Sequence, residues 1–288
     1  MYTDLYGNKR QKVGLHIHTT VSDGKETPRA ALELYKEKGY DAIAFTDHWA
    51  YGKADEIDGI TVISGAEYNY GESASEEGVV HILGLFAKDD PNIPRDATPQ
   101  EMIDAIHAAG GIAVLAHPAW SLNTLDMVRD MHGIDATEIY NAVSEAGESF
   151  RPDSSLIVDI LASRGIKFPL LATDDTHYYD DIDNGKGFIM VESDDNSPEK
   201  LKKAILEERF YASQGPEIHL YRDGDKFCVD CSPVSHIYFA SNFVWAPRTA
   251  HGNGLTHAEY VPRKGEKFIR AFAVDENGKS AWTNIVML

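Results

Sequence analysis

The chain has 288 residues, 43% of them hydrophobic and 25% charged, which excludes intrinsic disorder and fibrous repeats. Its 27 Lys and Arg against 46 Asp and Glu give a formal net charge of −19, which opposes stable binding of long nucleic acids. Two cysteines cannot build a disulfide framework, and we find neither a signal peptide nor an apolar run of about 18 residues. We therefore expect a cytoplasmic protein with no membrane partner.

The first two thirds of the chain alternate short apolar runs with amphipathic segments. Strands are predicted, in chain order, at residues 13–18, 42–48, 61–68, 81–86, 112–117, 137–141, 169–175 and 188–192. Helices are predicted at residues 28–38, 99–109, 124–131, 154–163 and 198–209. Thr27-Pro28 and Ser197-Pro198 place a capping hydroxyl and a proline at two helix starts. This α/β alternation predicts a parallel sheet covered by helices, and about seven such units favour a barrel.

The pattern changes after Gln214-Gly215-Pro216, where short, partly alternating runs are separated by turns and no helical period appears. A small antiparallel β-sandwich is predicted from the runs at residues 218–222, 227–231, 236–240 and 268–274. We therefore divide the chain into a barrel of residues 1–213 and a small β-rich domain of residues 214–288. Residues 71–78, with the sequence GESASEEG, are predicted to form a mobile acidic loop.

Six of the twelve histidines share a position, because each lies at an end of a predicted barrel strand: His16, His18, His48, His81, His117 and His177. Such strand ends converge on one face of a barrel, where active sites form. Asp175 and His177 are two residues apart and so point the same way, as do His16 and His18.

Two further acids belong with these histidines. Asp23 follows the first histidine pair in a loop that can fold back over the strand end. Glu67 ends an otherwise apolar strand, where an unpaired carboxylate is costly. Six imidazoles crowded together without a cation make a poor structural cluster. The nine side chains together therefore predict a multinuclear metal site.

These side chains stand in ordered motifs, which are His16-Ile-His18-Thr19 with Ser22-Asp23-Gly24, Thr46-Asp47-His48, Gly65-Ala66-Glu67, Ala116-His117-Pro118 and Asp175-Thr176-His177. Over residues 12–213 the chain thereby resembles the PHP (polymerase and histidinol phosphatase) superfamily. The resemblance implies a distorted (β/α)7 barrel, two or three divalent metals and phosphoesterase chemistry. The segment 210–216 and the final Ala281-Trp282-Thr283-Asn284 are similar to the carbaryl-hydrolase-like branch, which includes hydrolases of non-phosphate esters.

The resemblance also implies which side chains bind each metal. The first metal would be bound by His16, His18, Glu67 and Asp175. Glu67 would bridge to a second metal, held by His81 and His117, and a third would be held by Asp23, His48 and His177. Mixed imidazole and carboxylate ligation favours Mn, Fe or Zn over Mg or Ca.

Two acids beside the ligands are open to more than one interpretation. The family usually has Ser-Asp-x-His where this chain has Asp174-Asp175-Thr176-His177. Asp175 is preferred as the ligand because it is two residues from His177, and Asp174 is either a hydrogen-bond partner of a ligand or solvated. Asp47 points away from His48 and is either such a partner or a structural acid.

The predicted reaction is hydrolysis of phosphate mono- or diesters of small molecules or nucleotides through a hydroxide that bridges two metals. Beyond this hydroxide and Glu67 as bridging ligand, no catalytic residue is assigned. The metals outweigh the three carboxylates in charge, so a small anionic, phosphorylated substrate suits the site. Substrate contacts are predicted for residues that follow ligands or strand ends, namely Trp49, Tyr68, Asn141 and Tyr178. Arg151 could reach a phosphate, but a surface ion pair is the favoured interpretation for this residue.

Two other functions compete with this one. The same site could hydrolyse carboxyl esters, amides or carbamates, as the resemblance of the final residues suggests. The chain could also be a non-catalytic, metal-stabilised binding module, but the complete set of nine ligands argues against such a loss of activity.

Overall fold

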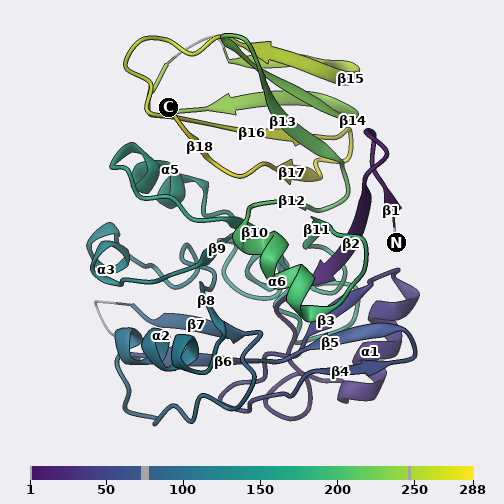
Figure 1. Ribbon diagram of the computed structural model, residues 1–288, viewed down its shortest axis with the longest axis vertical. Coiled ribbons are helices and arrows are strands. Elements are labelled where there is room, and N and C mark those ends of the chain that lie inside the picture. Colours follow the sequence, from purple (N-terminus) through teal and green to yellow (C-terminus); the bar gives the residue numbers. More distant parts are fainter. Residues whose placement is uncertain (1, 73–77, 246–247) are drawn as a thin grey trace.

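The computed structural model describes residues 2–72, 78–245 and 248–288, which confirm an α/β fold (Figure 1). Over these residues the helices are short, namely α1 (Pro28–Glu37), α2 (Pro99–Ala108), α3 (Leu125–Asp130), α4 (Val143–Ala146), α5 (Ser155–Ser163) and α6 (Pro198–Leu206). None of them is long and apolar enough to cross a membrane. Most of the predicted acidic loop, residues 73–77, lies outside the described residues.

Helix starts follow the sequence signals in part. The Thr27 hydroxyl accepts a hydrogen bond from the backbone N–H of Ala30, as its capping role requires. Ser197 precedes α6 as predicted, but its hydroxyl donates to the Asp195 carboxylate instead of capping the helix. Both helices have proline in the first turn, where a missing N–H costs nothing.

The larger, 13-stranded sheet begins with the N-terminal strands. Its strands up to residue 213 are β1 (Tyr2–Thr3), β2 (Lys9–Gly14), β3 (Ala42–Ala44), β4 (Asp55–Ile57), β5 (Ile60–Ile63), β11 (Phe188–Glu192) and β12 (Phe210–Ser213). β2, β3 and β5 are parallel, whereas β11 runs antiparallel to both β2 and β12.

The smaller, five-stranded sheet has the order β10-β9-β8-β7-β6. Its strands are β6 (Gly65–Tyr70), β7 (Val80–Leu85), β8 (Ile112–Leu115), β9 (Ala136–Asn141) and β10 (Leu170–Thr173). The single strand predicted at residues 61–68 is therefore two strands, divided at Ser64 between the two sheets. β7 is antiparallel to β6 and β8, so the all-parallel prediction was wrong here. The connection of residues 71–79 is shorter than the roughly one dozen residues that a parallel crossover needs.

The two sheets meet at isolated bridges instead of closing into one continuous ladder. Over the described part of the chain, these bridges join Ile17 to Thr176, His48 to Glu67 and Gly52 to Gly65. Trp49, His117 and Asp175 near this seam have positive φ angles of 56°, 26° and 52°, which extended strands do not accommodate. The predicted barrel thus opens into two sheets along the line where the predicted metal ligands lie.

After residue 214 the described residues contain strands but no helices, and these strands lie at the top of Figure 1. They are β13 (Ile218–Asp223), β14 (Lys226–Ala240), β15 (Thr249–Tyr260), β16 (Phe268–Val274), β17 (Ser280–Trp282) and β18 (Val286–Met287). The two strands predicted at residues 227–231 and 236–240 are one long strand, β14. β15 was not predicted, because it is mostly exposed and its polar, glycine-containing sequence lacks alternation.

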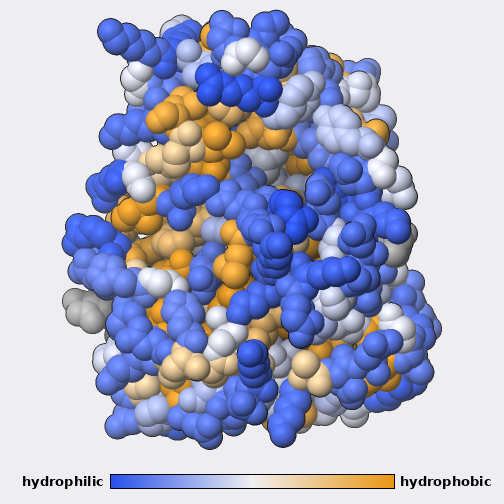
Figure 2. Space-filling view, viewed as in Figure 1, coloured by the Kyte–Doolittle hydropathy of each residue, from blue (hydrophilic) through white to orange (hydrophobic). Residues whose placement is uncertain are grey.

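The C-terminal strands share a core with the rest of the molecule. The Trp282 ring in β17 stacks on Tyr140 in β9 with ring centroids 5.6 Å apart, and both are buried. Arg270 in β16 is buried and forms two hydrogen bonds, of 2.6 and 2.9 Å, with Asp159 in α5. Figure 2 shows hydrophobic residues on the face where α5 lies near the C-terminal strands, and Leu156 and Val286 are among the exposed large hydrophobic residues.

We expect Trp282→Ala to lower the free energy of unfolding by about 3–5 kcal/mol, the usual cost of removing a buried aromatic ring. Denaturant unfolding measures this. Val286→Ala, at a position 40% exposed, should change stability by less than about 1 kcal/mol. Equal stabilities of Trp282→Ala and the wild type would show that the C-terminal strands do not share this core.

Candidate metal centre

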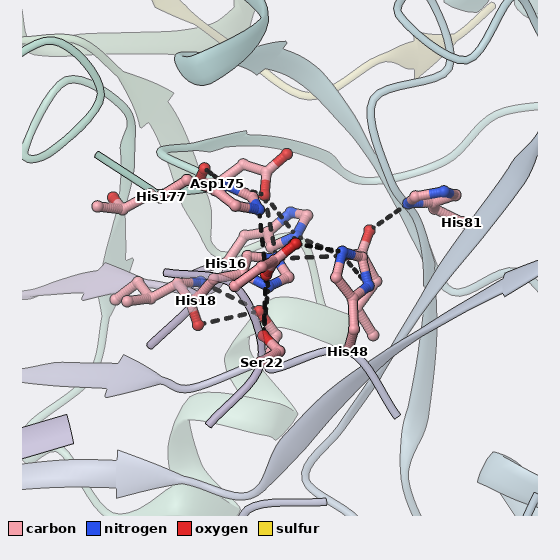
Figure 3. A network of polar contacts seen from close by, with 12 residues as sticks. His16, His18, Ser22, His48, His81, Asp175 and His177 are labelled. Atoms are coloured by element: carbon pink, nitrogen blue, oxygen red, sulfur yellow. Dashed lines mark hydrogen bonds and ion pairs between the residues drawn. The ribbon is translucent and has the colours of Figure 1, made fainter. Parts of the chain in front are cut away.

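The nine side chains predicted as metal ligands converge at the seam between the two sheets. They form three overlapping groups in which the possible donor atoms all lie within 4.8 Å of one another. The groups are His16, His18, Glu67 and Asp175; Glu67, His81 and His117; and His18, Asp23, His48 and His177. Figure 3 shows His16, His18, His48 and Asp175 pointing toward one another, with His177 and His81 at opposite ends of the cluster.

The first group is fully buried and has the dimensions of a metal cage. His16 Nε2 lies 3.1 Å from His18 Nε2 and 3.0 Å from Asp175 Oδ1. His18 Nε2 lies 3.1 Å from Glu67 Oε2 and 3.2 Å from Asp175 Oδ1. Ligands about 2.0–2.2 Å from a tetrahedral ion are separated by about 3.3–3.6 Å, close to these distances. Asp175 Oδ1 is buried without a hydrogen-bond partner among the described residues, so the donor set fits a divalent cation.

Glu67 connects the first group to the second with its two oxygens. Oε2 faces His16 and His18, whereas Oε1 lies 2.8 Å from His81 Nδ1 and 3.2 Å from His117 Nε2. This is the arrangement that a bridging carboxylate requires. His81 reaches it from the beginning of a strand because β7 runs opposite to its neighbours.

The third group lies nearest to solvent, since the Asp23 side chain is 52% exposed. Asp23 oxygens lie 3.4 Å from His18 Nδ1, 3.6 Å from His48 Nε2 and 3.5 Å from His177 Nε2. His18 therefore contributes one ring nitrogen to each of two groups, whereas the sequence assigned it to the first alone. Gly24 lets the Asp23 loop fold back, because a Cβ at this position would lie 2.4 Å from the His18 carbonyl oxygen.

The charges of the cluster depend on one another. Burial alone raises the pKa of Glu67, but the neighbouring His16 and His81 imidazoles hold this pKa well below its usual range. Burial lowers the pKa of His16, but Asp175, Glu67 and Glu138 together raise it to about 10. The carboxylates thus require positive charge beside them, which is supplied either by protonated imidazoles or by bound cations. Metal binding to such a cluster releases those protons.

Glu138 is an important residue that the sequence analysis missed. It is buried in β9, where Oε1 lies 2.7 Å from His16 Nδ1 and Oε2 accepts a hydrogen bond from the backbone N–H of His117. It thereby turns His16 Nε2 toward the first group and fixes the start of the His117 turn. A carboxylate inside an apolar strand was the signal that identified Glu67, and the same signal is present at Glu138.

Asp47 and Asp174 support the loops around the cluster. Asp47 accepts hydrogen bonds from the backbone N–H and the hydroxyl of Thr19, at 2.7 and 2.8 Å. It also accepts hydrogen bonds from the backbone N–H and the hydroxyl of Ser22. Asp174 is buried, not solvated, and accepts hydrogen bonds from Tyr35 and the backbone N–H groups of residues 185–187. Burial raises the pKa of Asp174 to about 6.

The residues predicted to contact the substrate do not all line the same cavity. The cluster opens into a cavity of ≈ 320 Å³, and Tyr178 lines it together with Lys25, Trp120 and Glu148, which the sequence analysis did not single out. Trp49 lines a neighbouring cavity.

The other three predicted contacts do not line the cluster's cavity. Tyr68 is buried in the core, and Arg151 is exposed. Asn141 is buried and donates to Glu138 and Asp175, so it orients ligands instead of facing the cavity.

Comparisons with known proteins show the family to which the chain belongs. The PHP domain model matches residues 14–178. The uncharacterized protein MJ1587 of Methanocaldococcus jannaschii is 33% identical over 155 residues, which cover 47% of this chain and 85% of the relative. A phosphoribosyl 1,2-cyclic phosphate 1,2-diphosphodiesterase of Eggerthella lenta is 35% identical over 80 residues, covering 25% of this chain and 29% of the relative.

A solved structure from Bacteroides vulgatus, a two-domain protein containing a predicted PHP-like metal-dependent phosphoesterase, shares the fold. Its TM-score is 0.59 at 14% identity, with 100% of this chain and 97% of that chain covered. Because the PHP domain model covers more than half of its length, the chain belongs to the PHP domain family. The predicted class, a metal-dependent hydrolase of the phosphoesterase type, is confirmed by this membership.

The three donor groups predict two to three divalent ions per chain after reconstitution with Mn or Fe. Glu67→Gln should lose at least one of them, because an amide cannot bridge two cations with two anionic oxygens. Elemental analysis measures the content. His107→Ala, which removes an imidazole that is bonded to Asp135 outside the cluster, should retain the wild-type number. One ion or none in the wild type would contradict the proposed ligand set.

Glu138→Gln should weaken metal binding about 10- to 100-fold, because the carboxylate that orients His16 becomes a neutral amide. Competition with a chelator, followed by elemental analysis, measures the affinity. Glu199→Gln, in the first turn of α6, provides a control that should bind metal like the wild type. Unchanged affinity in Glu138→Gln would limit Glu138 to a structural role.

Proposed function

We propose that the protein hydrolyses phosphate mono- or diesters of small molecules or nucleotides at this centre. The observation that supports this most strongly is the pair of Glu67 oxygens, each of which faces a different group of imidazoles. Two to three divalent ions, Mn, Fe or Zn, held by the nine side chains would supply Lewis acidity toward phosphoryl oxygens and would lower the pKa of water.

Lys25 is the cation of the chain best placed to bind the substrate. It lines the cavity beside the cluster, and its backbone N–H donates to the His177 carbonyl at 2.8 Å. Its Nζ lies 4.5 Å from the centre of the Tyr178 ring, which holds the ammonium by a cation–π interaction. Because no carboxylate of the described residues forms an ion pair with Nζ, the ammonium is available for a non-bridging phosphate oxygen.

Other side chains orient the predicted ligands and shape the cavity in which the substrate would bind. Glu138 and Asn141 hold His16 and Asp175 in place from behind, so that His16 Nε2 and Asp175 Oδ1 face each other at 3.0 Å. Trp120 lies against His81 and His117 and donates to Glu148 at 2.9 Å, which closes one side of the cavity. The net charge of −19 disfavours long nucleic acids at this opening, whereas a small phosphate interacts mainly with the nearby cations.

The arrangement of the whole chain belongs to the same proposal. Residues 1–213 would carry the chemistry in a barrel-like arrangement that is open at the seam, and residues 214–288 would form a β-rich domain that contributes no ligand and is joined to the first by the pairing of β12 with β17. The change from mixed elements to strands after β12 supports this division. We further propose that the protein works in the cytoplasm.

The reconstituted protein should hydrolyse 4-nitrophenyl phosphate with a kcat/KM at least tenfold above that for 4-nitrophenyl acetate, a preference of about 1.4 kcal/mol. Initial rates at pH 7–8 with Mn measure both. Glu67→Gln should lose the phosphatase activity while retaining the fold by circular dichroism. A tenfold preference for the acetate, or for an aryl carbamate, would instead identify a hydrolase of carboxyl esters or carbamates.

A further inference from the structure

A second, larger cavity lies beside the cluster and has no role in the function described above. Its volume is ≈ 770 Å³, within the roughly 300–1,000 Å³ of small-molecule sites. It is bounded by the end of β6, the start of β7, the start of α2 and helix α3, which lie on the left side of Figure 1. The lining residues on which the argument depends are Trp49, Asn69, Arg95, Met127 and Met131.

This cavity shares a wall with the metal centre. Trp49 directly follows the ligand His48, and its backbone N–H donates to the Glu67 carbonyl at 2.9 Å. Asn69 is two residues after Glu67 on β6 and therefore lies on the same face of the strand. In the β6–β7 ladder it lies opposite His81. Groups that line this cavity are thus the immediate neighbours of three predicted ligands.

The lining combines a flat aromatic surface with directed polar groups. The Trp49 Nε1–H donates to Asn69 Oδ1 at 2.5 Å, which fixes the indole and leaves the Asn69 amide N–H groups as donors. The Arg95 guanidinium lies 4.7 Å from the centre of the Trp49 ring. Met127 and Met131 supply an adaptable apolar wall.

Arg95 is the positive group of this cavity. Within the ranges that the structure describes, no carboxylate forms an ion pair with it, although Glu72 and Asp96 also line the cavity. A guanidinium held against an indole has its N–H edge available for a planar carboxylate or a phosphate. The cavity therefore suits an aromatic group that carries an anionic substituent.

We propose that this cavity binds the alcohol part of the substrate, an aromatic alcohol with an anionic substituent that Arg95 recognises. The inference depends on the proposed function, since it places the phosphoryl group at the metal centre next to this cavity. In this arrangement Arg95 is a specificity-determining residue. It also explains how a protein of net charge −19 can favour a substrate with an additional negative charge.

Two aryl phosphates test this inference, 4-(carboxymethyl)phenyl phosphate and 4-methylphenyl phosphate. The methylene group insulates the carboxylate from the ring, so the two leaving groups differ little in reactivity. We expect kcat/KM of the wild type to be at least tenfold higher for the carboxymethyl compound. Arg95→Met should reduce this ratio to about one. Arg129→Met is the matched control, because Arg129 is paired with Asp126 and Asp130 on α3, and it should keep the wild-type ratio.

Direct binding separates this inference from the proposed function. Calorimetry with 4-hydroxyphenylacetate, the product alcohol, should show binding to the wild type and at least tenfold weaker binding to Arg95→Met. If neither phosphate is hydrolysed but this difference in binding is found, the cavity is supported and the proposed function fails. If both phosphates are hydrolysed equally well and Arg95→Met binds the alcohol like the wild type, the inference is overturned and the proposed function stands. Failure of the wild type to bind the alcohol also overturns it.

Discussion

A fully buried carboxylate, Glu67, is the group around which the rest of this structure is arranged. An anion without exposure to water requires positive charge close by, and Glu67 finds it on both of its oxygens. The imidazoles that face it lie in or just beyond strands that are far apart in the chain, between His16 and His117. The packing of the two sheets against each other therefore also assembles the cluster, because Glu67 has imidazoles from both sides of the seam beside it.

This requirement explains why the sheet ladders stop where they do. At His48, His117 and Asp175 the side chains must turn toward a common centre, and the backbone leaves the extended conformation at or beside each of them. The cost of these conformations is offset by acids outside the cluster. Asp47 holds the first loop through Thr19 and Ser22, and Asp174 holds the last one through three backbone N–H groups.

Much of the cluster could be predicted from the sequence, because a ligand at a strand end is recognisable by its neighbours in the chain. Glu138 could be identified only by the same reasoning that found Glu67, a carboxylate inside an apolar strand. The reversal of β7 depends on the short connection before it, which hydrophobic pattern alone does not reveal. β15 lacks alternation because most of its side chains are exposed, so its pairing with β14 could not be anticipated.

The positions of the predicted substrate contacts depend on the local course of the backbone. Tyr68 follows Glu67 on a strand, so its side chain points to the opposite face, into the core. Tyr178 follows His177 in a turn, where this alternation does not apply, and it lines the cavity. In this chain the residue after a predicted ligand therefore lines the cavity at Tyr178, where the backbone turns, and not at Tyr68, where the strand continues.

The sharing of His18 between two groups has a consequence for the kinetics of ion exchange. His18 Nε2 belongs to the buried group, whereas Nδ1 lies beside Asp23, whose side chain is half exposed. An ion on the Asp23 side can be replaced by one from solution without separating the sheets. An ion on the Glu67 side would be enclosed by side chains that are almost wholly buried, so it would exchange more slowly even though the cavity reaches Glu67. The residence times of the two ions would therefore differ widely, and a chelator would remove them in a fixed order, the outer one first.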